Sequence, residues 1–453
     1  MQNKEFLGTE PIGKLLLKLA IPTVLAQLVN MLYNIVDRIF IGHIEGEGTL
    51  ALEGIGICMP IIMAVSAFAA LISSGGAPRA SICLGEGKQK DAEKILGNCF
   101  TLQIIVSAVL TAILLIFNHD LLMAFGANEV TIKYATDYMN IYAIGTIFVQ
   151  LTLGMNTYIT AQGATKIGMI SVLIGAVANI TLDPIFIYVF NMGIKGAALA
   201  TIISQALSCI WTLSFLFGKK TIFKIRKKNV GVNPKIVLPC IALGLAPFMM
   251  QLSESVILIA FNSSLKAYGE PFAVGAMTIL SSIMQFAMLP LQGVAYGAQP
   301  ITSYNYGARN KERVKESFFV LLKVSLTYSI VLWAAIMLFP GAFASIFTED
   351  TGLIEFTKDA LRIYCSVLLI FGMQVAAQMT FISLGKALSS IVVAGVRKFV
   401  LLLPLIYIVP QFVENKTMGV YLAEPIADTL AVTFTAILFI IQFRKILKEM
   451  DKI

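Results

Sequence analysis

Charged residues are scarce in this chain of 453 amino acids. Asp, Glu, Lys and Arg make up 13% of it, whereas an ordinary soluble domain contains about a quarter charged residues. Hydrophobic residues make up 57%, and the mean hydropathy is +0.82. This composition excludes a soluble fold and predicts a multi-pass membrane protein.

Negative charge is scarcer than positive charge, since the formal net charge is +8. A basic protein can bind nucleic acid, but here the basic residues fall in short runs between apolar segments. Membrane topology accounts for that pattern better than phosphate binding does. We therefore expect the lipid bilayer as a partner and no nucleic acid.

The sequence also lacks paired cysteines and clustered histidines. Its six cysteines lie singly within apolar stretches, so neither a disulfide framework nor a zinc site is indicated. His43 and His119 fall in predicted outer loops, and no nucleophile and base stand at catalytic spacing. The chain is therefore predicted not to be an enzyme and to need no prosthetic cofactor.

Long apolar runs dominate what is present. Windows of about 19 residues predict an all-α integral membrane fold with twelve transmembrane helices. Their approximate limits are 14–41, 51–78, 93–117, 132–159, 166–190, 194–217, 236–265, 272–304, 315–340, 355–383, 387–412 and 418–444. The polar start runs into the first span without a small-residue cleavage site, so no cleavable signal peptide is expected.

Lysine and arginine are concentrated in alternate connections between these spans. Seven lie between 219 and 235, whereas the connections of the other set hold only Lys195, Lys266 and Lys416. Basic residues stay on the cytoplasmic side of a membrane. We therefore predict a multi-pass protein of the inner (cytoplasmic) cell membrane, with both termini in the cytoplasm.

The two halves of the chain are related by an internal repeat. The stretch GGAPRASICLGEGKQKDAEK from residue 75 aligns with GAQPITSYNYGARNKERVKE from residue 297, at an offset of 222. The alignment pairs Pro78 with Pro300. The chain is therefore predicted to be a duplicated six-helix unit.

This duplication predicts the domain organisation. An N-terminal six-helix lobe is expected at 1–217, a cytoplasmic linker at 218–235 and a C-terminal six-helix lobe at 236–453. Because six is even, the lobes face the same way across the membrane and are related by a pseudo-two-fold axis along its normal. Transporters with two rocking halves use this arrangement.

Polar residues interrupt the fifth apolar run. Asn179 and Asp183 lie four positions apart, hence on one helix face, and Pro184 frees a backbone carbonyl one turn earlier. A carboxylate inside the hydrocarbon region costs roughly 3 kcal/mol, which makes it a functional-site hypothesis.

Asp37 and Thr201 reach a depth comparable to that of Asp183, roughly 10 Å below the outer helix ends. These four side chains favour a site for Na+ or for shared protons. The alternative is that the two aspartates only satisfy backbone or tyrosine groups.

The first span carries a polar stripe. Gln27, Asn30, Asn34 and Asp37 follow in steps of 3, 4 and 3 along one helix face, which must look into a watery cavity or the protein interior. Pro22 lies fifteen residues before Asp37 and provides a bending point. The pattern is typical of a helix that lines a passage and can flex.

These residues resemble the pattern of the multidrug and toxic compound extrusion (MATE) family. The spacing of Pro22 and Asp37, the NxxxD of Asn179 and Asp183, and Thr201 eighteen positions on all fit it, and the resemblance covers essentially the whole chain. The motifs GAQPITSYNYGA and MQLSESV are most similar to its bacterial MepA-like and DinF-like members.

The resemblance implies a V-shaped transporter that exports cationic amphipathic drugs in exchange for Na+ or H+. It also implies that Asp37, Asn179, Asp183 and Thr201 form the cation-coupling site, which holds the metal ion if sodium is used. Pro22 would be the hinge of the first helix.

The second half fits this family less well. Glu254, in MQLSESV, stands near a membrane glutamate of sodium-coupled NorM-type relatives, but Gln374 and Gln378 stand where those relatives have an aspartate. Coupling is therefore assigned to the first half. Glu254 is interpreted as a cavity charge that attracts a cationic substrate or titrates.

Arg397 and Lys398 occupy the middle of the eleventh span, where an unpaired charge is costly. At least one of them should pair with Glu254, Glu424 or Asp428, and a structural and a functional ion pair are both open. Methionines such as Met284 can form an adaptable drug surface, although they more often pack in a core. The predicted substrate-cavity residues are Gln27, Asn30, Asn34, Gln251, Glu254, Met284 and Arg397.

The predicted function is secondary active multidrug efflux by a monomer whose lobes rock between two states. One alternative is a flippase for a lipid-linked precursor, but such a cavity should favour basic groups, and carboxylates outnumber Arg397 and Lys398. A channel or a membrane receptor is a second alternative. That function leaves the grouping of Asn179, Asp183 and Thr201 unexplained.

Overall fold

The structure, a computed structural model, describes residues 6–268 and 272–451, which are almost entirely helical. The first half contains α1 (Phe6–Thr9), α2 (Ile12–Gly42), α3 (Gly48–Gly85), α4 (Gln89–Ile116), α5 (Asn118–Ala124), α6 (Thr131–Ala161), α7 (Thr165–Pro184), the π-helix η1 (Ile185–Val189) and α8 (Ile194–Phe217). The short helix η2 (Lys227–Asn229) lies in the linker. The second half contains α9 (Pro234–Ala267), α10 (Ala273–Gly307), α11 (Lys311–Leu338), α12 (Pro340–Ser345), α13 (Thr351–Tyr364), η3 (Leu368–Ile370), α14 (Phe371–Ser383), α15 (Ala387–Gly395), the π-helix η4 (Val396–Leu402), α16 (Leu403–Ile408), η5 (Val409–Gln411) and α17 (Lys416–Met450).

Eleven helices in this part of the chain are long and apolar enough to cross a membrane, and α13 with the segment from η3 to α14 forms a twelfth, bent span. The bend is 46°. At the break, the indole Nε1 of Trp333 donates a hydrogen bond to the carbonyl oxygen of Ser366 at 2.9 Å. A side chain thus satisfies a backbone group that the interrupted helix leaves free. The predicted twelve-span fold is confirmed, with the tenth span broken.

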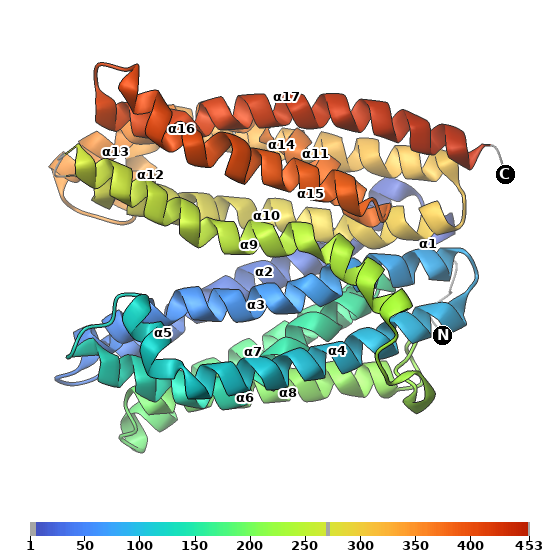
Figure 1. Cartoon of the computed structure of the whole chain (residues 1–453), viewed down its shortest axis with the longest axis horizontal. Coiled ribbons are helices and arrows are strands. Elements are labelled where there is room, and N and C mark those ends of the chain that lie inside the picture. Colours follow the sequence, from blue (N-terminus) through green and yellow to red (C-terminus); the bar gives the residue numbers. More distant parts are fainter. Residues whose placement is uncertain (1–5, 269–271, 452–453) are drawn as a thin grey trace.

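The helices form two bundles that lie side by side, α2 to α8 and α9 to α17 (Figure 1). Each bundle has its own buried cores. Helix α1 and the end of α17 lie at the same end of the molecule (Figure 1). The segment between α8 and α9 lies against the first bundle, where Phe223 is buried and Arg226 pairs with Glu93.

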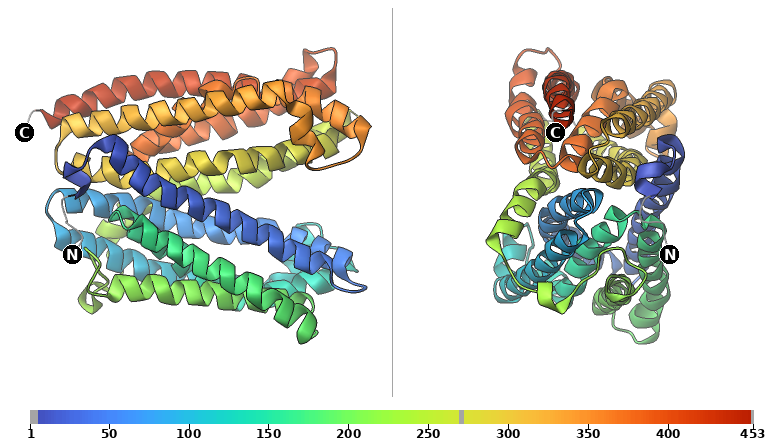
Figure 2. Two further views of the ribbon diagram at one scale, coloured as in Figure 1. Left: turned by 180° about the vertical axis from the view of Figure 1, so that it is seen from behind. Right: turned by 90° about the vertical axis from the view of Figure 1, so that its right-hand side faces the viewer.

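Helix α2 is shared between the two bundles. Its first half places Leu15 and Leu19 in a core with Phe318 of the second bundle. Its second half places Ile41 in a core of the first bundle. Figure 2 shows this dark-blue helix crossing from one bundle to the other. The buried Pro22 lies between the two parts, at the position where the helix changes bundle.

Helix α9 makes the reciprocal crossing. Cys240, near its beginning, packs in a core of the first bundle, whereas Phe261, near its end, packs in a core of the second. Pro247 lies between them. Each lobe therefore holds the beginning of the other lobe's first long helix, and a relative movement of the lobes must act on α2 and α9 near these prolines.

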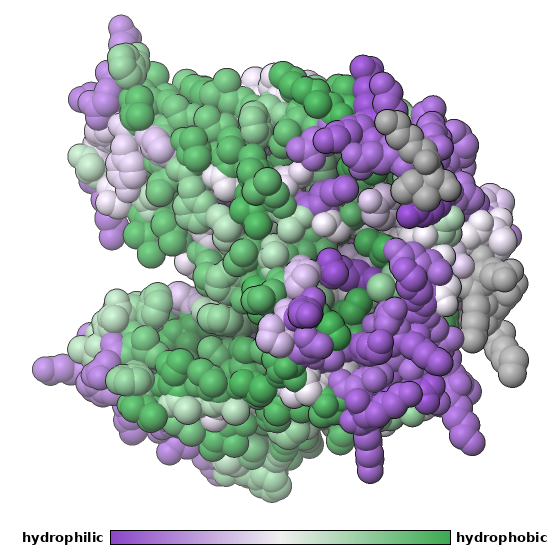
Figure 3. Space-filling view, turned by 45° about the vertical axis from the view of Figure 1, so that its right-hand side comes forward, coloured by the Kyte–Doolittle hydropathy of each residue, from purple (hydrophilic) through white to green (hydrophobic). Residues whose placement is uncertain are grey.

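Glycines let the first halves of α2 and α9 pack closely against helices of the other bundle. A Cβ atom on Gly244 of α9 would lie 1.8 Å from the carbonyl oxygen of Leu71 in α3. A Cβ atom on Gly297 of α10 would lie 2.6 Å from the Cα atom of Ala20 in α2. These crossings belong to the helix halves near the chain termini. Figure 3 shows a cleft between the lobes that opens at the opposite end, with an apolar outer surface around it.

Candidate functional site

Helix α7 brings two of the predicted polar residues together. Asn179 and Asp183 are one turn apart and both are buried. The amide Nδ2 of Asn179 donates a hydrogen bond to Oδ1 of Asp183 at 3.2 Å. The helix then passes through Pro184 into the π-helix η1. Single π-turns inside membrane helices frequently mark functional sites.

Asp37 of α2 faces this pair. Its carboxyl group and that of Asp183 are within hydrogen-bonding reach of each other. Among the described residues, Oδ1 of Asp37, Oδ2 of Asp183 and Oδ1 of Asn179 are buried without a hydrogen-bond partner. Buried acceptors without donors are costly. The site therefore presents three unsatisfied oxygen atoms from two helices.

Neutral side chains complete the group. Tyr138 of α6 is buried within hydrogen-bonding reach of Thr201 in α8, and it interacts electrostatically with Asp37. Tyr33 of α2 is within reach of Gln205 in α8. The structure therefore brings all four predicted cation-site residues into one region of the first lobe.

This arrangement can hold a small cation. Oxygen donors from carboxylate, amide and hydroxyl groups suit a hard ion such as Na+. The two facing carboxylates can instead share a proton. Within residues 6–268 and 272–451 no group of three or more His, Cys, Asp or Glu side chains is arranged so that it could hold a metal ion. A sodium ion would therefore depend on the neutral oxygens of Asn179 and Thr201 as well as on Asp37 and Asp183.

The residues predicted to line a substrate cavity divide between the lobes. On α2, Gln27 and Asn30 are half-buried and Asn34 is exposed, and its amide Nδ2 donates to the carbonyl oxygen of Asn30 at 2.6 Å. In the second lobe, Gln251 and Met284 are half-buried. Glu254 and Arg397 belong to a charged group.

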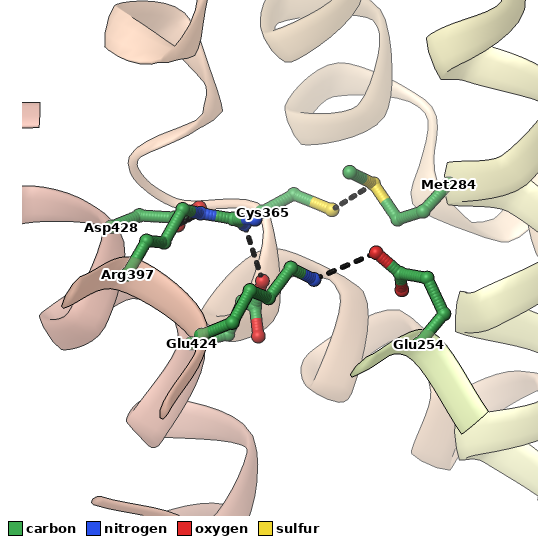
Figure 4. Close-up of polar contacts among 7 residues, drawn as sticks. Glu254, Met284, Cys365, Arg397, Glu424 and Asp428 are labelled. Atoms are coloured by element: carbon green, nitrogen blue, oxygen red, sulfur yellow. Dashed lines mark hydrogen bonds and ion pairs between the residues drawn. The ribbon is translucent and has the colours of Figure 1, made fainter. Parts of the chain in front are cut away.

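That group lies inside the second lobe (Figure 4). Arg397, in η4, donates from Nε to Oδ1 of Asp428 at 2.7 Å and from an η nitrogen to Oε1 of Glu424 at 3.0 Å. The Nζ of Lys398, also in η4, lies 2.8 Å from Oε1 of Glu254 in α9. The prediction that at least one of these two bases pairs with Glu254, Glu424 or Asp428 is therefore confirmed, and the structure pairs both bases and all three acids.

Three neighbours of the four predicted residues, Tyr33, Tyr138 and Gln205, were not predicted. Tyr33 lies one helical turn before Asp37, and Gln205 lies one turn after Thr201, so the four-residue spacing could have indicated both. Tyr138 lies in a span rich in tyrosine and threonine, and no local spacing sets it apart from its neighbours.

Comparison with known proteins agrees with this geometry. The model of the MatE family matches residues 22–185 and again 247–408. Each match begins at the proline where the first long helix of a lobe changes bundle, Pro22 or Pro247. The family unit therefore occurs twice, once in each half of the chain.

Individual relatives are similar over most of their length. The multidrug export protein MepA of Staphylococcus haemolyticus is 25% identical over 362 residues, which cover 80% of this chain and 79% of the relative. MepA of Staphylococcus aureus (strain NCTC 8325 / PS 47) is 23% identical over 363 residues, with the same coverage. A solved structure of a MATE protein in the bent conformation matches with a TM-score of 0.93 at 23% identity and covers both chains completely. This last likeness shows the fold.

Proposed function

The chain belongs to the MatE family, and we propose from this premise that it exports small cationic, amphipathic molecules in exchange for sodium ions or protons. MatE proteins are membrane transporters rather than enzymes, and relatives matched over 80% of this chain are named multidrug export proteins. The observation that carries the proposal is the pair of facing, buried carboxylates of Asp37 and Asp183, with oxygen atoms that lack partners.

The carboxylate pair supplies the driving ion site. Two carboxylates inside a membrane protein are costly unless their charge is compensated. A sodium ion or a shared proton supplies that compensation, with Asn179 and Thr201 as further oxygen donors. We therefore assign cation coupling to the first lobe.

Helix α2 links that site to the position of the lobes. Asp37 lies in its second half, within the first lobe, whereas its first half packs in the second lobe. A cation that binds at Asp37 acts on the part of α2 beyond Pro22. Coupling requires that cation and drug have different relative affinities for the two lobe arrangements. We propose Pro22 as the hinge at which this difference arises.

The cleft between the lobes receives the drug. The polar stripe of α2 and the exposed carboxylate of Glu254 lie on helices that take part in both lobes. The lobes meet near the chain termini and part at the other end (Figure 3). If the termini lie in the cytoplasm, as the distribution of basic residues predicts, the cleft opens outward, and we therefore propose an outward-open state of a monomeric transporter in the cytoplasmic membrane.

The charges of the second lobe argue against a flippase for phosphate-bearing lipids. Arg397 and Lys398, the central basic residues, both form ion pairs with carboxylates. A phosphate group would have to displace those partners. We therefore prefer a cationic substrate.

Proteoliposomes with independently imposed sodium and pH gradients test the proposal. Wild-type protein should move ethidium in response to at least one inward cation gradient. The double variant Asp37→Asn/Asp183→Asn should show no response, whereas Asp137→Asn, which removes a half-buried carboxylate paired with Lys195, should transport like the wild type. Ethidium movement that ignores both gradients would overturn the proposal.

A further inference from the structure

In the internal repeat, two acids of the charged group in the second lobe occupy positions equivalent to neutral residues beside the proposed cation site of the first lobe. GAALAT at 196–201 aligns with GVYLAE at 419–424, so Glu424 takes the position of Thr201. Continued by one turn, the same alignment places Asp428 at the position of Gln205. The twelfth span therefore has carboxylates where the sixth span has neutral groups.

The fifth and eleventh spans show the opposite exchange. Asn179 and Asp183 precede Pro184, and Arg397 and Lys398 precede the repeat-equivalent Pro404. Both spans contain a π-helix next to this proline, at 185–189 and at 396–402. The second lobe thus has bases in the span where the first lobe has an acid and an amide.

The ammonium group of Lys398 occupies the position beside the carboxylate of Glu254 that a bound cation could otherwise take. Its Nζ is 2.8 Å from the carboxylate of Glu254, and its side chain is 7% exposed while that of Glu254 is 57% exposed. The carboxylate is therefore open to the surroundings of the lobe, and the ammonium group lies behind it. Buried charge of this kind needs a counter-ion.

The rest of the group holds η4 in place. Arg397 is bound by both Glu424 and Asp428 and lies over the ring of Phe371, with its guanidinium carbon 4.7 Å from the ring centre. The contacts of Arg397 with Glu424, Asp428 and Phe371 therefore fix the backbone segment to which Lys398 belongs. Unlike a solvated ion, the ammonium group of Lys398 cannot leave the site.

We propose that Lys398 is a tethered counter-ion at Glu254, which keeps this carboxylate from binding an exchangeable sodium ion or proton. The side chain of Lys398 then determines how many exchangeable cations the second lobe binds. The inference deepens the proposed exchange of drug for cation, since it confines that exchange to the first lobe. It also concerns equilibrium cation binding, which is measured without transport.

The test counts cations bound to purified full-length protein in lipid nanodiscs. Bound sodium is measured by equilibrium dialysis with radioactive Na+, and bound protons by potentiometric titration against the unfolded chain. Lys398→Met should bind about one more cation per chain than the wild type, because the carboxylate of Glu254, which lies on a membrane-spanning helix, loses its partner. Lys398→Arg, which keeps the charge, should bind the wild-type number.

The double variant Glu254→Gln/Lys398→Met removes both charges at once and therefore leaves no buried charge unpaired. It should bind the wild-type number of cations if Glu254 holds no exchangeable ion. A deficit of one cation in this variant would overturn the proposal, as would a folded Lys398→Met protein with no additional cation. The extra cation should persist in the Asp37→Asn/Asp183→Asn background, where the proposed transport site is removed, so the two proposals fail separately.

Discussion

In the first lobe Asp37 and Asp183 face each other, and each has a buried oxygen atom without a partner in the described structure. In the second lobe Glu254, Glu424 and Asp428 each have a basic partner, although Oε2 of Glu424 is also buried without a hydrogen bond. Both groups sit beside a π-helix and a proline of repeat-equivalent spans. We propose that the same fold compensates its acids in two ways, by an exchangeable ion in the first lobe and by fixed side chains in the second. In this proposal only the exchangeable ion drives transport.

The largest effect is expected in the first lobe. Asp183→Asn should lower ethidium efflux from energised cells by about tenfold or more, because a tenfold change corresponds to only about 1.4 kcal/mol of coupling free energy. Asp137→Asn is the matched control. Normal efflux by Asp183→Asn would remove the functional difference between the lobes.

The second lobe should respond in stability instead. Arg397→Met leaves Glu424 and Asp428 buried without their base and should lower the free energy of unfolding by about 3–5 kcal/mol. The triple variant Arg397→Met/Glu424→Gln/Asp428→Asn should recover most of this loss. Reaction of the buried cysteines with a fluorescent thiol dye during heating reports unfolding. A triple variant as unstable as the single one would contradict this account.

The crossing of α9 with α3 is expected to be sensitive to one added methyl group. Gly244→Ala places a Cβ atom 1.8 Å from a backbone oxygen of α3, so it should cost about 1–3 kcal/mol through overpacking. Gly13→Ala is the control, since a Cβ atom there meets nothing within 4 Å. Equal thermal-unfolding curves for the two variants would show that α3 and α9 are not closely packed at this crossing.

The smallest effect should come from a single hydroxyl group. Tyr138→Phe removes a neutral neighbour of Thr201 and Asp37 and should weaken cation binding about two- to tenfold, the range for one hydrogen bond. Tyr328→Phe removes a hydroxyl that donates to the carbonyl oxygen of Ala287 in the second lobe at 2.7 Å. It should leave cation affinity unchanged. Equal losses of cation affinity in the two variants would contradict the assignment of the cation to the first lobe.

Much of the fold could be predicted because the bilayer sets span length and the repeat sets the lobes. The spans predicted at 14–41 and 194–217 became α2 and α8 with their ends displaced by no more than two residues. The crossing of α2 could not be predicted, because Leu15 and Ile41 are equally apolar and hydropathy does not say which lobe buries each. The break in the tenth span depends on Trp333, which is distant in sequence.

The same limit applies to the sites. The spacing of Asn179 and Asp183 is local, so it could be recognised in the sequence. The pairing of Lys398 with Glu254 joins residues 144 positions apart, and the sequence could only name Glu254 among three candidate partners. Which acids have a built-in counter-ion is a property of packing between helices.

Release of cations by the drug tests the central claim most directly. Purified protein saturated with sodium, or held in a weakly buffered solution, is titrated with ethidium while free Na+ and protons are recorded. The account predicts that the wild type releases about one sodium ion or about one proton per bound drug, and that Asp37→Asn/Asp183→Asn releases neither. Equal release by the double variant, or drug binding to the wild type without release of either ion, would contradict it.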